Sequence, residues 1–269
     1  MMRRHSRLFG VSMAAALALA LAGAASGASA QQGPCGPSFV DRFDTLNTSR
    51  WYVSDGWANG DYQNCLWSKS QVSISDGILH LGYGPQPSED RDYACSEIQT
   101  RQRYGYGIYE ARMKTAAGPG LNSSLFSYVG PTDKQPHDEI DFEILGKDAS
   151  QVQLNYYADG KGGHETLVPV PGGADAGFND YAFVWEEGRI RWYINGELVE
   201  EASDPEGLPE HTQKIFLTLW GSDSKPEWLG RFQDPGSVQV DVDWVAFTAP
   251  GDDCQFPESI ACTLSSKGD

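Results

Sequence analysis

The sequence predicts an all-β domain built as an antiparallel sandwich or jelly roll. Short runs that alternate apolar and polar residues, or that are rich in aromatic residues, recur along the chain and are separated by Gly, Pro, Asn and Asp. Stretches with helical periodicity are nearly absent after the first 30 residues. Strands at this density without crossover helices indicate antiparallel pairing.

The first 30 residues have the parts of a signal peptide: a basic start, an apolar stretch over 8–25, and a small-x-small cleavage pattern at Ala28-Ser29-Ala30. A retained membrane anchor is the alternative, but alanine, a weakly apolar residue, dominates the stretch and glycine interrupts it. We therefore expect residues 1–30 to be removed and the protein to be secreted, beginning at Gln31. No later segment is long and apolar enough to insert into a membrane.

The runs that predict strands come next in the chain. They cover residues 71–74, 78–81, 106–113, 125–128, 151–157, 181–185, 190–194, 214–219 and 238–247. Two dipeptides, Asp76-Gly77 and Asn195-Gly196, are strong hairpin signals because tight hairpin turns need the positive φ angles that Asn, Asp and Gly adopt. No repeat or linker divides the chain, so residues 31–250 are predicted to form one domain, followed by a polar C-terminal tail over 251–269.

The charge and the cysteines limit the possible functions. The chain has 37 acidic and 20 basic residues and a formal net charge of −17, which disfavours nucleic acid and anionic lipid as partners. An exported chain with five cysteines is expected to form disulfides, and the odd count leaves one thiol unpaired or intermolecular. Spacing does not define the pairing, although Cys254 and Cys262 are close enough to close a short loop. No Cys/His pattern typical of zinc is present.

The candidate chemistry lies in residues 138–144, where acidic and apolar residues alternate with period two. On a strand, Glu139, Asp141 and Glu143 would share one face, while the apolar residues between them would face the core. Neighbouring carboxylates repel one another and raise the pKa of at least one of them. Retaining glycoside hydrolysis uses such a pair: one ionised carboxylate as nucleophile and one protonated carboxyl as acid, roughly 5–5.5 Å apart.

A solvent-facing acidic stripe is the alternative interpretation of this run. The aromatic residues of the surrounding segments favour a sugar-binding face, because sugar rings stack on aromatic side chains. These residues are Trp57, Tyr93, Tyr128, Tyr156, Tyr157, Trp220 and Trp228, of which about half are expected to pack in the core instead.

With the run Glu139-Ile-Asp-Phe-Glu143 in view, the sequence resembles glycoside hydrolase family 16, and most strongly its bacterial licheninases (endo-β-1,3-1,4-glucanases). The similarity covers nearly the whole mature chain, from Phe39 to Trp244. It includes the segments at 55–60, 64–67, 104–110, 145–148, 155–157, 162–165 and 227–230.

This resemblance implies a jelly roll of two curved antiparallel sheets with a cleft on the concave side, Glu139 as nucleophile, Glu143 as acid/base and Asp141 as their helper. It implies a disulfide between Cys65 and Cys95, a monomer, and catalysis without a cofactor. A structural calcium ion would lie at Asp243 and the backbone of Gly77. The residues expected to bind substrate are Trp57, Asn59, Glu97, Gln99, Phe126, Tyr128, His137, Asn155, Tyr157 and Trp220.

Three positions depart from the licheninase pattern, which has Trp at His137, Arg at Gln99 and Asn at Thr218. These positions contact sugar in the family, so they affect the choice of substrate rather than the reaction. Together with the Cys254–Cys262 tail they resemble a second branch, the endo-glycanases with which bacteria cut their own succinoglycan-type exopolysaccharide. We expect a retaining endo-β-glycanase acting on β-1,3-1,4-glucan, with exopolysaccharide depolymerisation as the first alternative. A non-catalytic glucan-binding module and a transglycosylase are the others.

Overall fold

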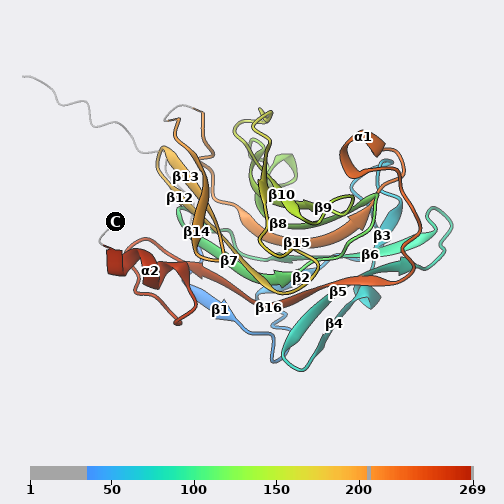
Figure 1. Cartoon of the computed structure of the whole chain (residues 1–269), viewed down its shortest axis with the longest axis horizontal. Helices are drawn as coiled ribbons and strands as arrows, with labels where there is room; N and C mark the ends of the chain where they lie inside the picture. Colours follow the sequence, from blue (N-terminus) through green and yellow to red (C-terminus); the bar gives the residue numbers. More distant parts are fainter. Residues whose placement is uncertain (1–34, 205–206, 268–269) are drawn as a thin grey trace, which may run out of the picture. The chain divides into compact units, whose positions relative to one another are not determined.

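The computed structural model describes residues 35–204 and 207–267 (Figure 1). The predicted signal peptide over residues 1–30 lies outside the described residues. The described part of the chain confirms the all-β prediction, since it contains sixteen strands, two short 3₁₀ helices and two short α-helices.

The observed strands extend most of the predicted runs by one to four residues at an end. In chain order they are β1 (Phe39–Asp41), β2 (Trp51–Val53), β3 (Cys65–Trp67), β4 (Val72–Ser75), β5 (Ile78–Pro85), β6 (Tyr93–Thr100), β7 (Gly107–Lys114), β8 (Leu121–Val129), β9 (Asp138–Leu145), β10 (Gln151–Tyr157), β11 (Thr166–Pro169), β12 (Asn179–Glu186), β13 (Arg189–Ile194), β14 (Glu197–Ala202), β15 (Lys214–Gly221) and β16 (Val238–Thr248). The helices are η1 (Lys69–Gln71), η2 (Pro131–Asp133), α1 (Pro226–Leu229) and α2 (Ile260–Lys267).

The strands form two layers of mainly antiparallel sheet that are joined at one place. The first layer has the order β11-β10-β9-β8-β15-β6 and the second the order β5-β16-β7-β12-β13-β14. They are connected where the end of β5 pairs with the start of β6 through Gly84–Ala94 and Pro85–Tyr93. In Figure 1, β8, β9 and β15 lie above β7 and β16.

The main core lies between the layers and determines which way β9 faces. Ile140, Phe142 and Ile144 are fully buried, and the Phe142 ring packs against Tyr181 of β12 with ring centroids 5.4 Å apart. Burying such a side chain contributes roughly 1.5–3 kcal/mol. A one-residue slip of β9 would expose these three apolar side chains and push three carboxylates into the core, so the register is strongly specified.

Both predicted hairpin turns are confirmed by their backbone angles. Asp76 and Gly77 have φ angles of 53° and 74° and join β4 to β5. Asn195 and Gly196 have φ angles of 52° and 81° and join β13 to β14.

The C-terminal segment is more ordered than the polar tail expected from its sequence. It ends in helix α2 and is held to strand β7 by the buried Glu110, whose carboxylate accepts hydrogen bonds from Ser259 Oγ (2.6 Å) and Ile260 N (2.7 Å). A disulfide joins Cys254 to Cys262 and closes the expected short loop. Of the helices that the structure describes, none has the length and apolar character needed to cross a bilayer.

Candidate active site

Strand β9 places the three acidic residues on one face, as the sequence predicts, and this face forms the wall of a cleft. The cleft has a volume of about 680 Å³, and Glu139, Asp141 and Glu143 all line it. The other lining residues are Asn59, Tyr62, Trp67, Glu97, Ser124, Phe126, His137, Gln153, Asn155, Tyr157, Glu165, Thr218, Trp220, Lys225 and Trp228.

Pairing of β9 with β8 and β10 sets the neighbours of each acid. Side chains directly opposite one another on adjacent strands share a face, so the register produces three rows across this face of the sheet. The rows are Ser124–Glu143–Gln153, Phe126–Asp141–Asn155 and Tyr128–Glu139–Tyr157. The sheet therefore presents two rows that contain aromatic rings and one row of polar side chains.

Glu143 is arranged as a protonated carboxyl. Burial, together with the charges of Glu139 and Glu165, raises its pKa to about 8, although a hydrogen bond from Asn122 opposes the shift. That bond runs from Asn122 Nδ2 to Glu143 Oε1 over 3.0 Å, and Gln153 Nε2 donates to Oε2 over 3.2 Å. At neutral pH the Glu143 carboxyl therefore holds a proton that it can transfer to a leaving oxygen.

Glu139 has a hydrogen-bond partner on each side along the chain: His137 just before β9 and Asp141 within it. His137 Nε2 lies 2.5 Å from Glu139 Oε2. Asp141 lies on the other side, and its pKa is raised well above the usual value by burial and by the charges of Glu139 and Glu143. A protonated Asp141 donates a hydrogen bond to Glu139, so the strand supplies one carboxylate flanked by two donors and one carboxyl that holds a proton.

The structure brings most of the predicted substrate-binding residues together. Seven of them line the cleft: Asn59, Glu97, Phe126, His137, Asn155, Tyr157 and Trp220. The remaining three lie beside it and contact residues that line it. Trp57 is 39% exposed and packs edge-on against Trp67, Gln99 Nε2 donates to Glu97 over 3.2 Å, and the Tyr128 ring meets His137 edge-on.

Several lining residues, Tyr62 among them, were not predicted as site residues, whereas Trp228 and Thr218 were named only as a stacking candidate and as a departure from the licheninase pattern. Tyr62 and Trp220 pack edge to face with centroids 5.6 Å apart, and Trp228 lies beside Trp220 and donates from Nε1 to Gln153 over 3.1 Å. Thr218 is buried, and its hydroxyl has no hydrogen-bond partner among the residues that the structure describes. Their apolar or alternating surroundings are a weak signal in the sequence, since core residues have the same pattern.

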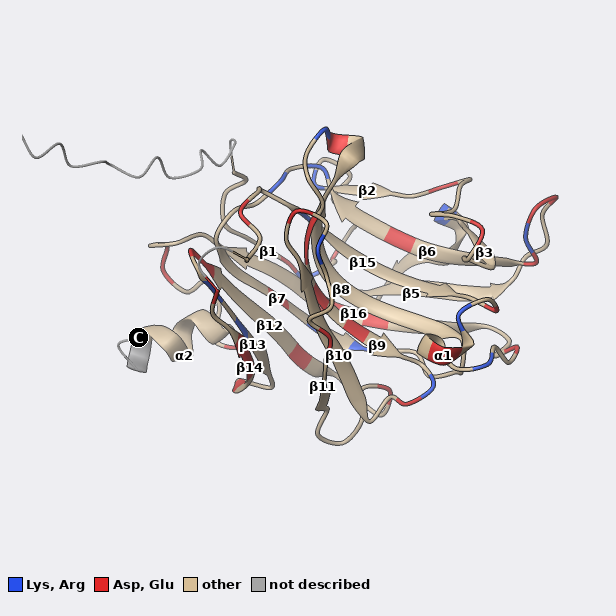
Figure 2. Ribbon diagram, turned by 90° about the horizontal axis from the view of Figure 1, so that it is seen from above, with Lys and Arg blue, Asp and Glu red and all other residues tan. Residues whose placement is uncertain are grey.

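Glu97 is a further buried acid that lines the cleft. Burial raises its pKa to about 7, and hydrogen bonds from Ser54 Oγ (2.5 Å) and Gln99 act against this shift. Figure 2 shows acidic residues on both β6, the strand that contains Glu97, and β9. Of the described residues, Lys225 is the one Lys or Arg that lines the cleft, so the site suits a neutral ligand better than an anionic one.

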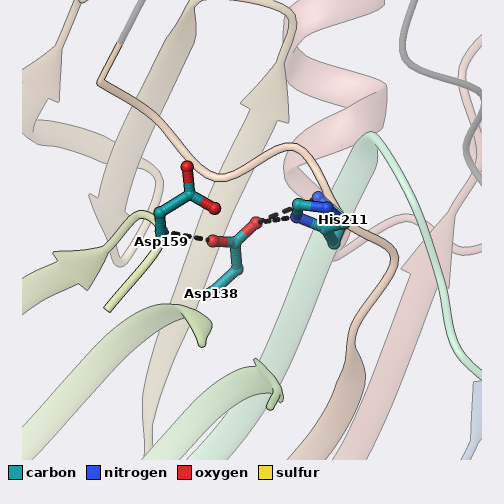
Figure 3. A group of neighbouring side chains, drawn as sticks. All are labelled: Asp138, Asp159 and His211. Atoms are coloured by element: carbon teal, nitrogen blue, oxygen red, sulfur yellow. Dashed lines mark hydrogen bonds and ion pairs between the residues drawn. The ribbon is translucent and has the colours of Figure 1, made fainter. Parts of the chain in front are cut away.

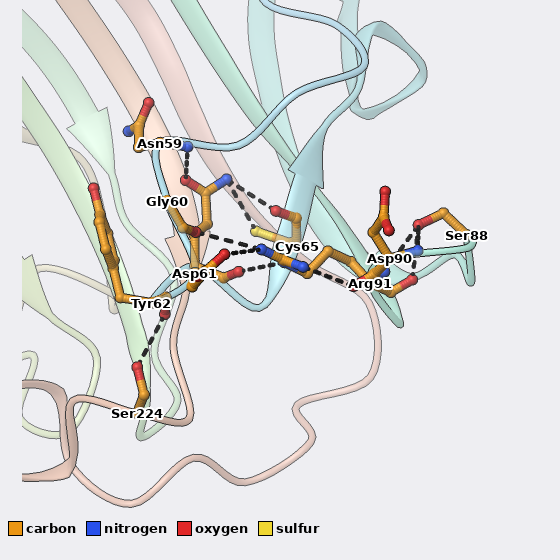
Figure 4. A network of polar contacts seen from close by, with 10 residues as sticks. Asn59, Gly60, Asp61, Tyr62, Cys65, Ser88, Asp90, Arg91 and Ser224 are labelled. Carbon is orange, nitrogen blue, oxygen red and sulfur yellow. Dashed lines mark hydrogen bonds and ion pairs between the residues drawn. The ribbon is translucent and has the colours of Figure 1, made fainter.

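The loop that places Asn59 and Tyr62 in the cleft is anchored by a polar network beside a disulfide (Figure 4). The Gln63 side chain is buried, accepts from Asn59 N over 3.2 Å and donates to Cys65 O over 3.0 Å. Arg91 Nε donates to Gln63 O over 2.8 Å. Cys65 and Cys95 form the disulfide that the resemblance implies. Cys35 is exposed and belongs to neither disulfide.

A group next to the nucleophile candidate has ligand types that suit a metal ion. The ligand atoms of Asp138, Asp159 and His211 lie within 4.8 Å of one another (Figure 3). However, Asp138 already accepts four hydrogen bonds, from Asp159 N, Glu210 N, His211 N and His211 Nδ1, at 2.8–3.0 Å. With its lone pairs engaged in this way, Asp138 is better suited to fixing two loops to the start of β9 than to binding a cation.

The chain matches the family model described as glycosyl hydrolases family 16 over residues 59–246. It is 59% identical over 227 residues to the endo-1,3-1,4-beta-glycanase ExoK of Rhizobium meliloti (strain 1021), with 84% of each chain covered. It is 40% identical over 214 residues to the beta-glucanase of Bacillus subtilis (strain 168), with 79% of this chain and 87% of the relative covered.

Among solved structures, the Bacillus licheniformis beta-glucanase is similar to the chain with a TM-score of 0.76 and 39% identity, covering 80% of this chain and 99% of the other. A lichenase from a mouse hindgut metagenome is similar with a TM-score of 0.76 and 40% identity, covering 79% and 99%. Together with the jelly-roll layers and the acidic strand that lines the cleft, these matches establish that the chain belongs to glycosyl hydrolase family 16.

Proposed function

We propose that the protein is a retaining endo-β-glycanase that hydrolyses internal bonds of β-1,3-1,4-linked glucan. The observation that supports this most directly is the common face of Glu139, Asp141 and Glu143 on β9, with Glu143 protonated by burial and Glu139 between two donors. The relatives named above as a beta-glucanase, an endo-1,3-1,4-beta-glycanase and a lichenase support the choice of substrate.

In this mechanism each carboxyl acts twice. Glu139 attacks the anomeric carbon while Glu143 gives its proton to the leaving glycosidic oxygen, which produces a glycosyl-enzyme ester. A water molecule then attacks the same carbon as Glu143 takes a proton from it, and the electron pair of the ester bond returns to Glu139. Asp141 holds Glu139 between the steps. These steps need only side chains of this chain and no cofactor.

Depolymerisation of an acidic exopolysaccharide is the second candidate. The departures at His137, Gln99 and Thr218 favour it, because they change polar groups in or beside the cleft. The predominance of carboxyls over cations in the cleft argues against it, because an anionic polymer needs positive charge for binding. We therefore place glucan first.

The test is to compare kcat/KM on lichenan and on succinoglycan, with product sizes determined for each. Glucan specificity predicts rapid loss of lichenan viscosity and mixed oligosaccharide products. Faster cleavage of succinoglycan would transfer the proposal to the second candidate. The Glu139→Gln variant is the control, and it is expected to keep the fold and lose hydrolysis; substantial residual activity would refute the assignment. Products longer than the substrate, with an acceptor sugar in excess, would show transglycosylation.

We further propose that the protein is secreted after removal of residues 1–30 and acts as a monomer. The structural calcium ion implied at Asp243 and the Gly77 backbone stays a prediction. Asp243 Oδ2 lies 3.3 Å from Arg112 Nε, and the same guanidinium also contacts Asp180 over 2.8 Å. We therefore leave calcium out of the proposal.

A further inference from the structure

We propose that His137 is a positioning residue for the nucleophile, whose Nε2–H holds the Glu139 carboxylate and stabilises it when the glycosyl-enzyme is hydrolysed. The inference rests on the proposed function, in which Glu139 forms the ester. It assigns to His137 a role that a tryptophan at this position, the residue of the licheninase pattern, would not fill in the same way.

The geometry fixes the His137 ring against the carboxylate. His137 lies two residues before Glu139 on the same face, and its Nε2 is 2.5 Å from Glu139 Oε2. The ring stacks on Tyr157 of β10 with centroids 4.6 Å apart and planes 16° apart, and it meets Tyr128 of β8 edge-on at 5.2 Å. The His137 backbone is held as well, since its carbonyl oxygen accepts from Gly160 N over 2.8 Å.

The proton in this contact belongs to the imidazole. An ionised carboxylate has acceptor sites only, so the Nε2 atom must donate. The side chains of His137 and Glu139 are 31% and 20% exposed, and this partial shielding from water strengthens a hydrogen bond to a charged group. Because two tyrosine rings confine the imidazole, the bond also restricts the rotation of the carboxylate.

The two reaction steps depend on this bond in opposite ways. When Glu139 attacks, negative charge leaves its carboxylate, so a donor at Oε2 gives no electrostatic help beyond orientation. When water cleaves the ester, the electron pair returns to Glu139, and the His137 N–H stabilises the charge as it develops. Loss of the donor should therefore slow the release of the sugar from the ester more than its attachment.

The experiment uses stopped-flow kinetics with a 2,4-dinitrophenyl β-glucan oligosaccharide, which reports ester formation as a burst of dinitrophenol and ester hydrolysis as the steady rate. His137→Phe keeps a ring for stacking on Tyr157 and removes the donor. His137→Gln places an amide N–H about as far from the backbone as Nε2 of histidine. The Asn side chain of His137→Asn is one methylene shorter, so its amide does not reach Glu139. His80→Phe is the matched control, because it removes another histidine–carboxylate pair, His80 with Asp241 at 2.8 Å, on the second layer.

We expect His137→Phe and His137→Asn to lower the steady rate of dinitrophenol release roughly ten- to hundredfold, the rate factor that corresponds to the energy of a hydrogen bond to a charged group. The burst should become larger and KM should fall. His137→Gln should recover most of the rate, and His80→Phe should behave as the unaltered enzyme. Equal rates in the Phe, Asn and Gln variants would overturn the proposal. A raised KM with unchanged kcat would also overturn it, because that result would assign His137 to substrate binding alone.

Mass spectrometry of peptides from the quenched burst separates this inference from the function on which it rests. A sugar found on a residue other than Glu139 refutes the proposed mechanism itself. A sugar on Glu139 that is hydrolysed equally fast in all variants refutes the role of His137 alone.

Discussion

The high pKa of the Glu143 carboxyl should be visible in the pH dependence of hydrolysis and should respond to its neighbour Asn122. Burial raises this pKa to about 8, while the amide of Asn122 stabilises the carboxylate and lowers it. Replacing Asn122 by Leu removes the donor and fills a similar volume with apolar atoms, which keeps water out. The pKa of Glu143 should therefore rise further.

The size of this rise follows from the single hydrogen bond that is lost. A hydrogen bond to a charged group is worth about 1.5–3 kcal/mol, and one pKa unit corresponds to about 1.4 kcal/mol, so we expect a rise of roughly one to two units. A general acid works only while protonated, so activity is lost as pH rises through its pKa. The alkaline limb of kcat/KM should therefore begin near pH 8 and move upward in Asn122→Leu.

The assay is reducing-sugar release from soluble lichenan at low substrate concentration, across the pH range in which the folded protein is stable. The control is Ser124→Ala, which removes the hydrogen bond from Ser124 Oγ to Asn122 Oδ1 but keeps the Asn122 amide donor. Its alkaline limb should stay in place. An alkaline limb that does not move in Asn122→Leu, or that moves to lower pH, would contradict Glu143 as the acid.

Two further predictions concern stability. Burial raises the pKa of Glu110 from 4.5 to about 7, so the folded state binds more protons than the unfolded state between these pH values and loses stability as pH rises through this window. Glu110→Gln should therefore gain on the order of 3 kcal/mol in urea unfolding at pH 8 and nothing at pH 4; an equal effect at both pH values would contradict this origin. Cys262→Ser opens the loop closed by Cys254 and should lower the free energy of unfolding by roughly 2–3 kcal/mol while cleft activity persists. Lost activity at unchanged stability would show that the tail acts on the cleft.

The sequence predicts the parts of this fold in which one face is buried and the other is solvated. Strand β10 has the predicted bounds, and β9 was found because acidic and apolar residues alternate along it. Strand β6 (Tyr93–Thr100) was missed, since it is buried on both faces and its residues do not alternate. Helix α2 has eight residues, which are too few for a convincing helical period.

The site was predictable where a motif lies on one strand and less so where distant segments meet. The shared face of Glu139, Asp141 and Glu143 follows from the alternation of side chains along a strand alone. Tyr62 and Glu165 come from loops, and only tertiary packing brings them to the cleft. The bond from His137 to Glu139 was also missed, because spacing shows that two side chains share a face but does not show that they are in contact.

The identity of the two catalytic carboxyls can be tested in one measurement with azide. Glu139→Ala and Glu143→Ala are each incubated with a 2,4-dinitrophenyl β-glucan oligosaccharide and sodium azide, and NMR determines the anomer of the glycosyl azide that forms. With Glu139 as nucleophile, azide replaces its carboxylate in the first variant and gives the α-azide. In the second variant azide attacks the glycosyl-enzyme and gives the β-azide. The opposite pair of anomers, or the same anomer from both variants, would contradict the assignment of roles on strand β9.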